Sequence, residues 1–395
     1  MTRAGRGRYV KGRWAADPGA QTRAARLGSV YLAFVPDPIA DLDVALPANV
    51  AADLEDATLA IAFLNQLGPQ APPLEGVARQ LLRSESLASS RIEGLNVGHR
   101  RIALADFDER TADAKAIDIV GNIRAMQQAI EIAAGPDPID LDALLQIHRT
   151  LLRFGADEPI AGRWRQSQGW IGGMYPESAV YVPPPPGEVM QLVEDLCRFL
   201  ERDDMPALFQ AAIAHAQFET IHPFIDGNGR VGRCLIHAVL RRRGLTPRYV
   251  PPLSLILAAH CDAYFAGLEA YRGEEAGLYE WAGFFAETAA MAASEAGRLA
   301  AEIRSLQESW LERFSRPPRS DAAARRLLAL LPAYPVLNVA VATRELGVSD
   351  RAAGEALGQL QDVGIIRLVT KRLHGRAWEC PELFALVGDF EQSLR

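Results

Sequence analysis

A stretch of twelve residues, from His222 to Arg233, combines side chains and glycines that could carry phosphoryl or nucleotidyl chemistry. His222 can take up a proton near neutral pH. A carboxylate such as Asp226 beside phosphates is commonly a ligand of Mg²⁺. Gly227 and Gly229 allow the backbone to turn successive N–H groups toward one anion. We therefore predict a site for a metal-bound polyphosphate here, with His222 as the base.

Two arginines complete this predicted anion site. Arg230 and Arg233 stand three residues apart on a helix that we expect to begin near Arg230, so both guanidinium groups can reach the same oxyanions. The N-terminus of that helix adds partial positive charge. A preceding helix is predicted from Pro206 to Ile221, because Pro223 forces the residue before it out of the helical conformation.

These residues resemble the signature of Fic-domain proteins, His-Pro-Phe-x-Asp/Glu-Gly-Asn-Gly-Arg-x-x-Arg, and agree with it at every specified position. The resemblance implies a mainly helical protein that transfers AMP from ATP to a Ser, Thr or Tyr hydroxyl of a target protein. It also implies that His222 is the catalytic base and that Asp226 is both the Mg²⁺ ligand and part of the nucleotide site. The other expected nucleotide-binding residues of the signature are Gly227, Asn228, Gly229, Arg230, Val231, Gly232 and Arg233.

Two other patterns overlap the signature. Residues 227–232 also fit the dinucleotide-binding pattern GxGxxG, but that pattern follows a strand and this one follows a predicted helix. His215 and Glu219 share a helical face with His222, as metal ligands can. We expect His215 to be a packed, hydrogen-bonded histidine inside the helix, and Glu219 to be a partner of the site rather than a metal ligand.

A second short motif lies upstream of the signature. Ser89, Glu93 and Gly94 match the specified positions of the Fic inhibitory motif, Ser/Thr-x-x-x-Glu-Gly/Asn, as found in proteins whose inhibitory helix precedes the core. The resemblance implies that Glu93 pairs with Arg233 and so competes with the γ-phosphate of ATP. By itself the motif also fits a surface glutamate before a capping glycine. Together with the signature it predicts autoinhibition.

A β-hairpin is predicted shortly before the signature. Its strands, Gln168–Gly173 and Ala179–Val182, flank a turn that contains Pro176, and four prolines from Pro183 onward end it. By the family resemblance this hairpin is a flap over the active site, and its edge pairs with the backbone of the target protein. Three flap residues are expected to contact the nucleotide: Ile171, Gly172 and Gly173.

The whole chain reads as mainly α: a Fic-type helical core with a β-hairpin flap and a C-terminal winged helix-turn-helix domain. The predicted order is a disordered basic tail (1–27), an N-terminal helical region with the inhibitory motif (28–110), the Fic core (111–300), a linker helix and linker (301–319) and a winged-helix-like domain (320–395). Within the core, Tyr264 falls where the family places groups beside the nucleotide base. A core tyrosine fits that position equally well.

The C-terminal pattern resembles a winged helix-turn-helix. It predicts helices over Asp321–Leu331, Val339–Leu346 and Asp350–Val363, followed by a two-stranded wing over residues 364–369 and 377–380. The third helix would be the one to read DNA, yet it is hardly basic. The wing partly offsets this with Arg367, Lys371, Arg372 and Arg376. We expect a partner-docking or dimerisation module rather than a DNA reader, so DNA remains a partner that is not favoured.

Composition limits the remaining function classes. A formal net charge of −7 argues against bulk attraction to nucleic acid or to an anionic membrane. Four scattered cysteines without a CxxC pair suit reduced thiols, and neither a secretory signal nor an apolar run of ~20 residues is evident. We therefore expect a cytoplasmic protein with no membrane contact.

Three functions fit the sequence. The first is an autoinhibited protein adenylyltransferase that uses ATP and Mg²⁺, with a target protein as partner and a homodimer as a further expectation. The second uses the same site to remove AMP from a modified protein, with Glu93 orienting a water. The third is a transcription regulator that senses nucleotide.

Overall fold

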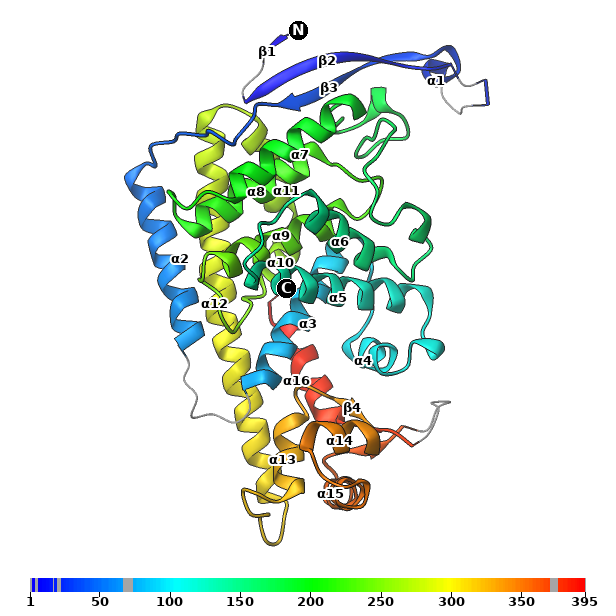
Figure 1. The fold of residues 1–395 in the computed structure, drawn as a ribbon, viewed down its shortest axis with the longest axis vertical. Helices are drawn as coiled ribbons and strands as arrows, with labels where there is room; N and C mark the ends of the chain where they lie inside the picture. Colours follow the sequence, from blue (N-terminus) through cyan, green and yellow to red (C-terminus); the bar gives the residue numbers. More distant parts are fainter. Residues whose placement is uncertain are drawn as a thin grey trace. The chain divides into compact units, whose positions relative to one another are not determined.

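The computed structural model describes residues 2–3, 6–16, 18–19, 23–66, 74–369 and 376–394. The chain is mainly helical, as predicted (Figure 1). It divides into two compact units: the first contains residues 1–59, 124–246 and 260–288, and the second contains residues 60–123, 247–259 and 289–395. Neither unit coincides with one of the predicted domains, because segments that are far apart in the sequence pack together in each. The composition of a local segment does not indicate which distant segment it packs against.

Helices make up most of the first unit, and residues of α2, α5 and α12 belong to both units. The helices are α1 (Arg23–Leu27), α2 (Ala48–Gln66), α5 (Ala114–Ala134), α6 (Leu141–Leu152), α7 (Pro186–Leu200), α8 (Ala207–Ile221), α9 (Asn228–Arg242), α11 (Cys261–Arg272) and α12 (Glu275–Glu312). Short 3₁₀ turns are η2 (Glu158–Ile160) and η3 (Pro176–Ser178).

An antiparallel sheet of three strands lies at the start of the chain, in the order β1 (Thr2–Arg3), β2 (Gly7–Trp14), β3 (Ser29–Pro36). β2 pairs with β3 along its whole length, so the prediction of a disordered basic tail over residues 1–27 is wrong for this stretch. The basic residues sit on a strand whose aromatic residues pack: the rings of Tyr9 and Phe34 lie 5.4 Å apart. Because β2 needs β3 as a partner, its own composition could not predict it.

Helix α8 is the centre of the first unit. Every residue in it except Ala207 and Glu219 is buried, as expected for a helix with neighbours on all sides. It contacts α7, α9, α11 and strand β3. Trp281 of α12 donates its indole N–H to the carbonyl of Ala212 at 2.9 Å. Packing along the whole length of α8 therefore fixes the position of its C-terminal end.

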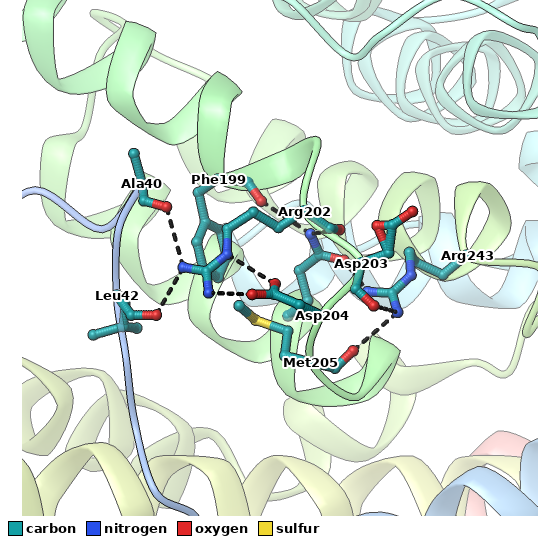
Figure 2. A network of polar contacts seen from close by, with 9 residues as sticks. Ala40, Leu42, Phe199, Arg202, Asp203, Asp204, Met205 and Arg243 are labelled. Atoms are coloured by element: carbon teal, nitrogen blue, oxygen red, sulfur yellow. Dashed lines mark hydrogen bonds and ion pairs between the residues drawn. The ribbon is translucent and has the colours of Figure 1, made fainter.

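Arginines fix the junction at the far ends of α8 and α9 (Figure 2). Arg202, in the turn before α8, donates to the carbonyls of Ala40 at 3.1 Å and Leu42 at 2.7 Å. Arg243, just after α9, donates to the carbonyl of Met205 at 2.9 Å. The Arg243 bond ties the beginning of α8 to the end of α9, and the Arg202 bonds tie the turn before α8 to the segment that follows β3. These contacts help to fix the positions of the two helices and therefore of the loop that joins their other ends.

The second unit combines helices from the middle and the end of the chain. Its elements are α3 (Leu74–Ile92), α4 (His99–Phe107), η1 (Glu109–Thr111), α10 (Leu253–Ala259), α13 (Ala323–Leu330), β4 (Val336–Leu337), α14 (Val339–Leu346), α15 (Asp350–Asp362), β5 (Arg367–Leu368), β6 (Trp378–Glu379) and α16 (Pro381–Gln392). One apolar cluster of this unit includes Leu87, Ile102 and Ile119. The backbone N–H of Ser254 donates to Glu85 at 2.7 Å and joins α10 to α3.

The C-terminal helices and the strands β5 and β6 follow the predicted order, whereas β4 is an additional strand that was not predicted. Helix α14 has the predicted bounds, α15 ends one residue earlier than predicted, and β4, β6 and β5 form a small antiparallel sheet. Arg367 of the predicted wing lies 2.8 Å from the carboxylate of Glu379, while Lys371 and Arg372 lie outside the described residues. The winged helix-turn-helix assignment stays a prediction. Among the helices of the described residues, none is both long and apolar enough to cross a membrane.

Candidate active site

The predicted site lies in the loop between α8 and α9, within the first unit. His222 caps α8 with φ 50° and ψ 61°, and in the described part of the chain it is the one residue other than glycine with positive φ. Such backbone strain persists only where surrounding contacts impose it, and it is common at functional sites. The amide of His222 donates to the carbonyl of Phe218 at 2.9 Å. Pro223 follows, so the predicted end of α8 is confirmed.

The side chain of Asn228 closes this loop. Its Oδ1 accepts from the backbone N–H of Phe224 at 2.8 Å, and its Nδ2 donates to the carbonyl of the same residue at 2.9 Å. Asn228 is buried. Its amide therefore shapes the loop, and any contact with phosphate would come from its backbone N–H. The predicted role of Asn228 in nucleotide binding stays a prediction.

Gly227 is the N-cap of α9, which begins at Asn228, two residues before the predicted start near Arg230. Its φ of 82° is left-handed, and a Cβ at this position would lie only 2.9 Å from Cδ2 of Leu151. No side chain caps this helix, so the first N–H groups of α9 are available to an anion. Gly229 lies in the same first turn. Of the two signature glycines, Gly227 has the left-handed backbone and Gly229 is helical, so the predicted concave arrangement of N–H groups stays a prediction.

His148 supports the loop from α6. Its Nδ1 accepts from the N–H of Gly162 at 2.9 Å, so Nε2 carries the proton and donates to the carbonyl of Asp226 at 3.0 Å. The ring stacks on Phe224 with centroids 3.7 Å apart. Burial lowers the pKa of His148 to about 4. The neutral ring is therefore part of the fold.

Acidification is expected to destabilise the protein through His148. Its pKa is about 4 in the fold and 6.5 ordinarily, so below pH 6.5 the unfolded chain binds more protons and the free energy of unfolding falls. The loss amounts to about 2 kcal/mol at pH 5. Urea unfolding at pH 7 and pH 5 measures it. A His148→Gln protein keeps one donor and one acceptor and should lose less stability between these pH values; an equal loss would contradict the assignment.

Asp226 and Arg230 form an ion pair at the edge of the site. Nη2 of Arg230 lies 2.6 Å from Oδ2 of Asp226. The arginine side chain is 6% exposed, whereas the aspartate side chain is 49% exposed. The carboxylate therefore faces solvent while the arginine holds it in place. The described residues contain no group of three or more His, Cys, Asp and Glu side chains that could hold a metal by themselves.

Arg233 is buried on the next turn of α9. Its Nη1 lies 3.5 Å from the hydroxyl of Tyr264, and the same hydroxyl bonds Nε2 of His215 at 2.8 Å. Burial, and then the charge of Arg233, lowers the pKa of His215 to about 3. The expectation of a packed, hydrogen-bonded His215 is confirmed. Tyr264 is 1% exposed and belongs to the core, and its predicted contact with a nucleotide base stays a prediction.

Close approach of α8 and α9 brings Glu219 beside the predicted base. Its Oε2 lies 4.0 Å from Nδ1 of His222. A Cβ at Gly232 would lie 2.4 Å from Oε1 of Glu219, so a larger residue there would displace this carboxylate. Val231, the remaining signature residue, is fully buried. Glu219 therefore occupies the partner position that the sequence reading assigns to it.

The predicted flap does not form two strands, and this prediction is wrong in detail. A single antiparallel bridge joins Ile171 to Tyr181, with the Ile171 N–H donating to the Tyr181 carbonyl at 2.8 Å. Gly172 and Gly173 have φ of 69° and 71°, and η3 follows them. These left-handed glycines turn the chain away from an extended path. The predicted nucleotide contacts of Ile171, Gly172 and Gly173 stay predictions.

Arg165 joins the flap to the signature loop, and sequence reasoning missed it. Its Nε donates to the carbonyl of His222 at 2.8 Å, and its Nη2 donates to the carbonyl of Pro184 at 2.6 Å. The side chain is buried, and burial lowers the pKa of Arg165 to about 10. No local pattern distinguishes it from Arg163, because its role depends on carbonyls that come from elsewhere in the chain.

The predicted inhibitory motif lies at the end of α3, in the second unit. Ser89 is buried in the helix, and Glu93 is exposed in the turn that follows it. Gly94 has φ of 80°, and the N–H of Leu95 donates to the carbonyl of Ser90 at 3.0 Å, which closes the helix end. The motif thus presents its glutamate at a capped helix terminus. The inhibitory role of Ser89, Glu93 and Gly94 stays a prediction.

Comparison with known sequences gives the same assignment for the middle of the chain. Residues 138–240 match the Fic/DOC family, and residues 51–131 match the Fic/DOC family N-terminal region. Proteins named protein adenylyltransferase Fic from Drosophila yakuba and Drosophila grimshawi are each 35% identical to the chain over 147 residues. That match covers 35% of this chain and 28% or 29% of the relatives, so the chain spans less than a third of their length.

Solved structures show the same fold. A Fic family protein from Desulfovibrio desulfuricans is similar with a TM-score of 0.53 and 21% identity, over 85% of this chain and 97% of that one. A Fic domain-containing signaling protein from Bacteroides thetaiotaomicron is similar with a TM-score of 0.50 and 16% identity, over 62% and 95%. The chain therefore contains a region that matches the Fic/DOC family over residues 138–240 and a region that matches the N-terminal part of that family over residues 51–131.

Proposed function

We propose that this protein is an adenylyltransferase that transfers AMP from ATP to a hydroxyl of a target protein. The observation that supports this most is the α8–α9 loop. It places an imidazole at a strained helix end beside an uncapped helix N-terminus that carries Arg230 and Arg233. The names of the curated relatives agree with this activity. The activity of the whole chain remains a proposal, because the chain spans only part of their length.

His222 is the proposed base. Its Nδ1 is on the side of Glu219, at 4.0 Å, so Nε2 is the nitrogen that would take the proton of the target hydroxyl. The hydroxyl oxygen then bonds the α-phosphorus of ATP, and the bond from that phosphorus to pyrophosphate breaks. The N–H groups at the start of α9 and the guanidinium of Arg230 stabilise the negative charge of the phosphates. Catalysis would come mainly from positioning and charge neutralisation.

Mg²⁺ fits the donor set as a substrate-bound ion. Mg²⁺ is usually held by one or two carboxylates together with phosphates and water. Asp226 supplies one half-exposed carboxylate beside the proposed phosphate site. When bound, Mg²⁺ would neutralise charge on the phosphates of ATP. We propose Asp226 as its one ligand from this chain.

The proposed reaction has a direct test. The purified chain, incubated with ATP labelled on the α-phosphate and with Mg²⁺, should label itself or a protein in an extract, and mass spectrometry should find AMP on a Ser, Thr or Tyr. Incubation with an AMP-bearing protein tests the opposite reaction in the same assay. Transfer of a group other than AMP, or removal of AMP without any transfer, would contradict the proposal.

Substitution of Gly227 by alanine is expected to abolish ATP binding. Alanine costs about 1–2 kcal/mol in a left-handed conformation, and its Cβ would also meet Leu151 at 2.9 Å. Gly244→Ala is the matched control: φ there is 72°, but a Cβ has open space. Both proteins should lose a similar free energy of unfolding from backbone strain, with an added loss at Gly227. Calorimetric titration should show that only Gly244→Ala still binds ATP; equal affinities would refute the anion site.

A further inference from the structure

A second site with the character of an anion pocket lies in the second unit, apart from the signature. It is a cavity of about 610 Å³ between α3, α4 and the segment that leads through β4 into α14. This volume is within the range of small-molecule sites. Its lining includes four arginines, Arg79, Arg83, Arg110 and Arg344, and two acidic residues, Asp106 and Asp108. The lining therefore carries a surplus of positive charge.

The buried side chain of Arg83 is the main evidence for an anion site in this cavity. The residue is 8% exposed, and it pairs with Asp106, whose Oδ2 lies 3.3 Å from Nη2. Within the described residues, Nε and Nη1 are buried and have no hydrogen-bond partner. A buried guanidinium with unsatisfied N–H groups is costly. Burial lowers the pKa of Arg83, and the charge of Arg79 adds to this effect while Asp106 opposes it. An anion in the cavity would satisfy both the hydrogen bonds and the charge.

Other groups of the lining point to the same ligand. Arg79 lies over the ring of Tyr334, with its guanidinium carbon 4.8 Å from the ring centroid, which fixes its position beside Arg83. At the start of α14, the side chain of Asn338 accepts from the N–H of Val341 at 2.9 Å. The N–H groups of the first two residues of a helix have no partner within it. A helix N-terminus and an unsatisfied arginine thus border one cavity.

Some of the positive charge is already compensated. Arg344 lies 2.7 Å from Glu345, and Nε of Arg110 lies 3.2 Å from Asp108. Among the acidic side chains of the lining, Asp106 pairs with Arg83. A phosphate monoester presents a compact group with up to two negative charges that matches a guanidinium fork. The cavity also has room for a small organic body beside the phosphate.

We propose that this cavity binds the phosphate group of a small phosphorylated molecule, with Arg83 as the main ligand and Arg79 and the α14 N-terminus as supporting donors. The site is distinct from the signature loop, because all of its residues belong to the second unit. It therefore gives the chain a second anion site that does not depend on the proposed AMP transfer.

Calorimetric titration of the full chain with inorganic phosphate and, separately, with glycerol 3-phosphate tests the site, with ionic strength held constant by chloride. The Gly227→Ala protein serves as the background, so that binding at the signature does not contribute. We expect millimolar or tighter binding, with glycerol 3-phosphate the stronger of the two. Phosphate binding alone would assign the site to the free ion and overturn the proposed monoester. Absence of binding by both would overturn the site.

Variants locate the binding. Arg83→Gln should weaken glycerol 3-phosphate binding at least about tenfold. Arg79→Gln should weaken it severalfold, and this variant keeps the test decisive if Arg83→Gln does not fold. Arg101→Gln is the matched control, since Arg101 is exposed on α4, pairs with Asp113 and does not line the cavity. Equal binding by Arg79→Gln, Arg83→Gln and Arg101→Gln would place the ligand elsewhere and refute the proposal.

Discussion

Substitution of His222 by alanine is expected to abolish AMP transfer. Loss of a general base typically costs 10² to 10⁴ in rate, so we expect a fall of about a thousandfold. ATP should still bind, because the N–H groups of α9 and the guanidinium of Arg230 do not depend on the imidazole. The initial rate of AMP incorporation, measured together with the affinity for ATP, separates the two effects.

Two controls distinguish the lost base from altered structure. His222 has a left-handed backbone, which alanine adopts at a cost but asparagine tolerates well. His222→Asn should therefore be as inactive as His222→Ala while it keeps more stability. His260→Ala removes an exposed histidine in the same unit and should leave the rate unchanged. A His222→Asn protein with more than a tenth of the original rate would exclude His222 as the base.

Substitution of Glu93 by glycine is expected to raise the rate of AMP transfer by about 10- to 100-fold, which corresponds to about 1.4–2.8 kcal/mol. The reason is the proposed competition between the Glu93 carboxylate and the γ-phosphate of ATP. Glu93 is exposed at the capped end of α3, so its removal should cost little stability. The measurement is AMP incorporation at an ATP concentration below saturation, where competition has its full effect.

The control variants for Glu93 test charge and loop flexibility separately. Glu93→Gln removes the charge and keeps the size, so it should raise the rate as glycine does. Asn96→Gly loosens the same exposed loop without a change of charge and should have no effect. If Glu93→Gly left transfer unchanged but abolished removal of AMP from a modified protein, Glu93 would belong to the hydrolytic reaction and autoinhibition would be wrong.

Sequence reasoning succeeded where function depends on neighbours in the chain. The end of α8 before Pro223 and the bounds of α14 follow from local rules of helix termination. The glycine spacing of the signature likewise implied a helix that begins within it, although the observed start at Asn228 precedes the predicted one. These features depend on backbone conformations that a few adjacent residues determine.

Sequence reasoning failed where the role of a residue depends on partners that are far away in the sequence. Arg165 donates to the carbonyls of Pro184 and His222, and no sequence pattern around position 165 indicates these contacts. Strand β2 requires β3 across a connection of 14 residues, so its arginines suggested a loose tail instead of a strand. The flap glycines Gly172 and Gly173 were expected in a strand, but both have left-handed conformations just before the turn at η3.

Glu391 affects how any shortened version of the chain should be interpreted. This buried glutamate of α16 lies 2.6 Å from Arg91 and 2.7 Å from His99. It is therefore the counter-charge for Arg91 within the predicted inhibitory motif and a partner of the histidine at the start of α4. Deletion of the last helix would leave Arg91 and His99 without that carboxylate in an apolar setting. A change in activity after such a deletion would therefore report on the repositioned end of α3 as well as on the missing segment. Glu391→Gln keeps the helix and removes only the charge, so it is a more selective variant than the deletion.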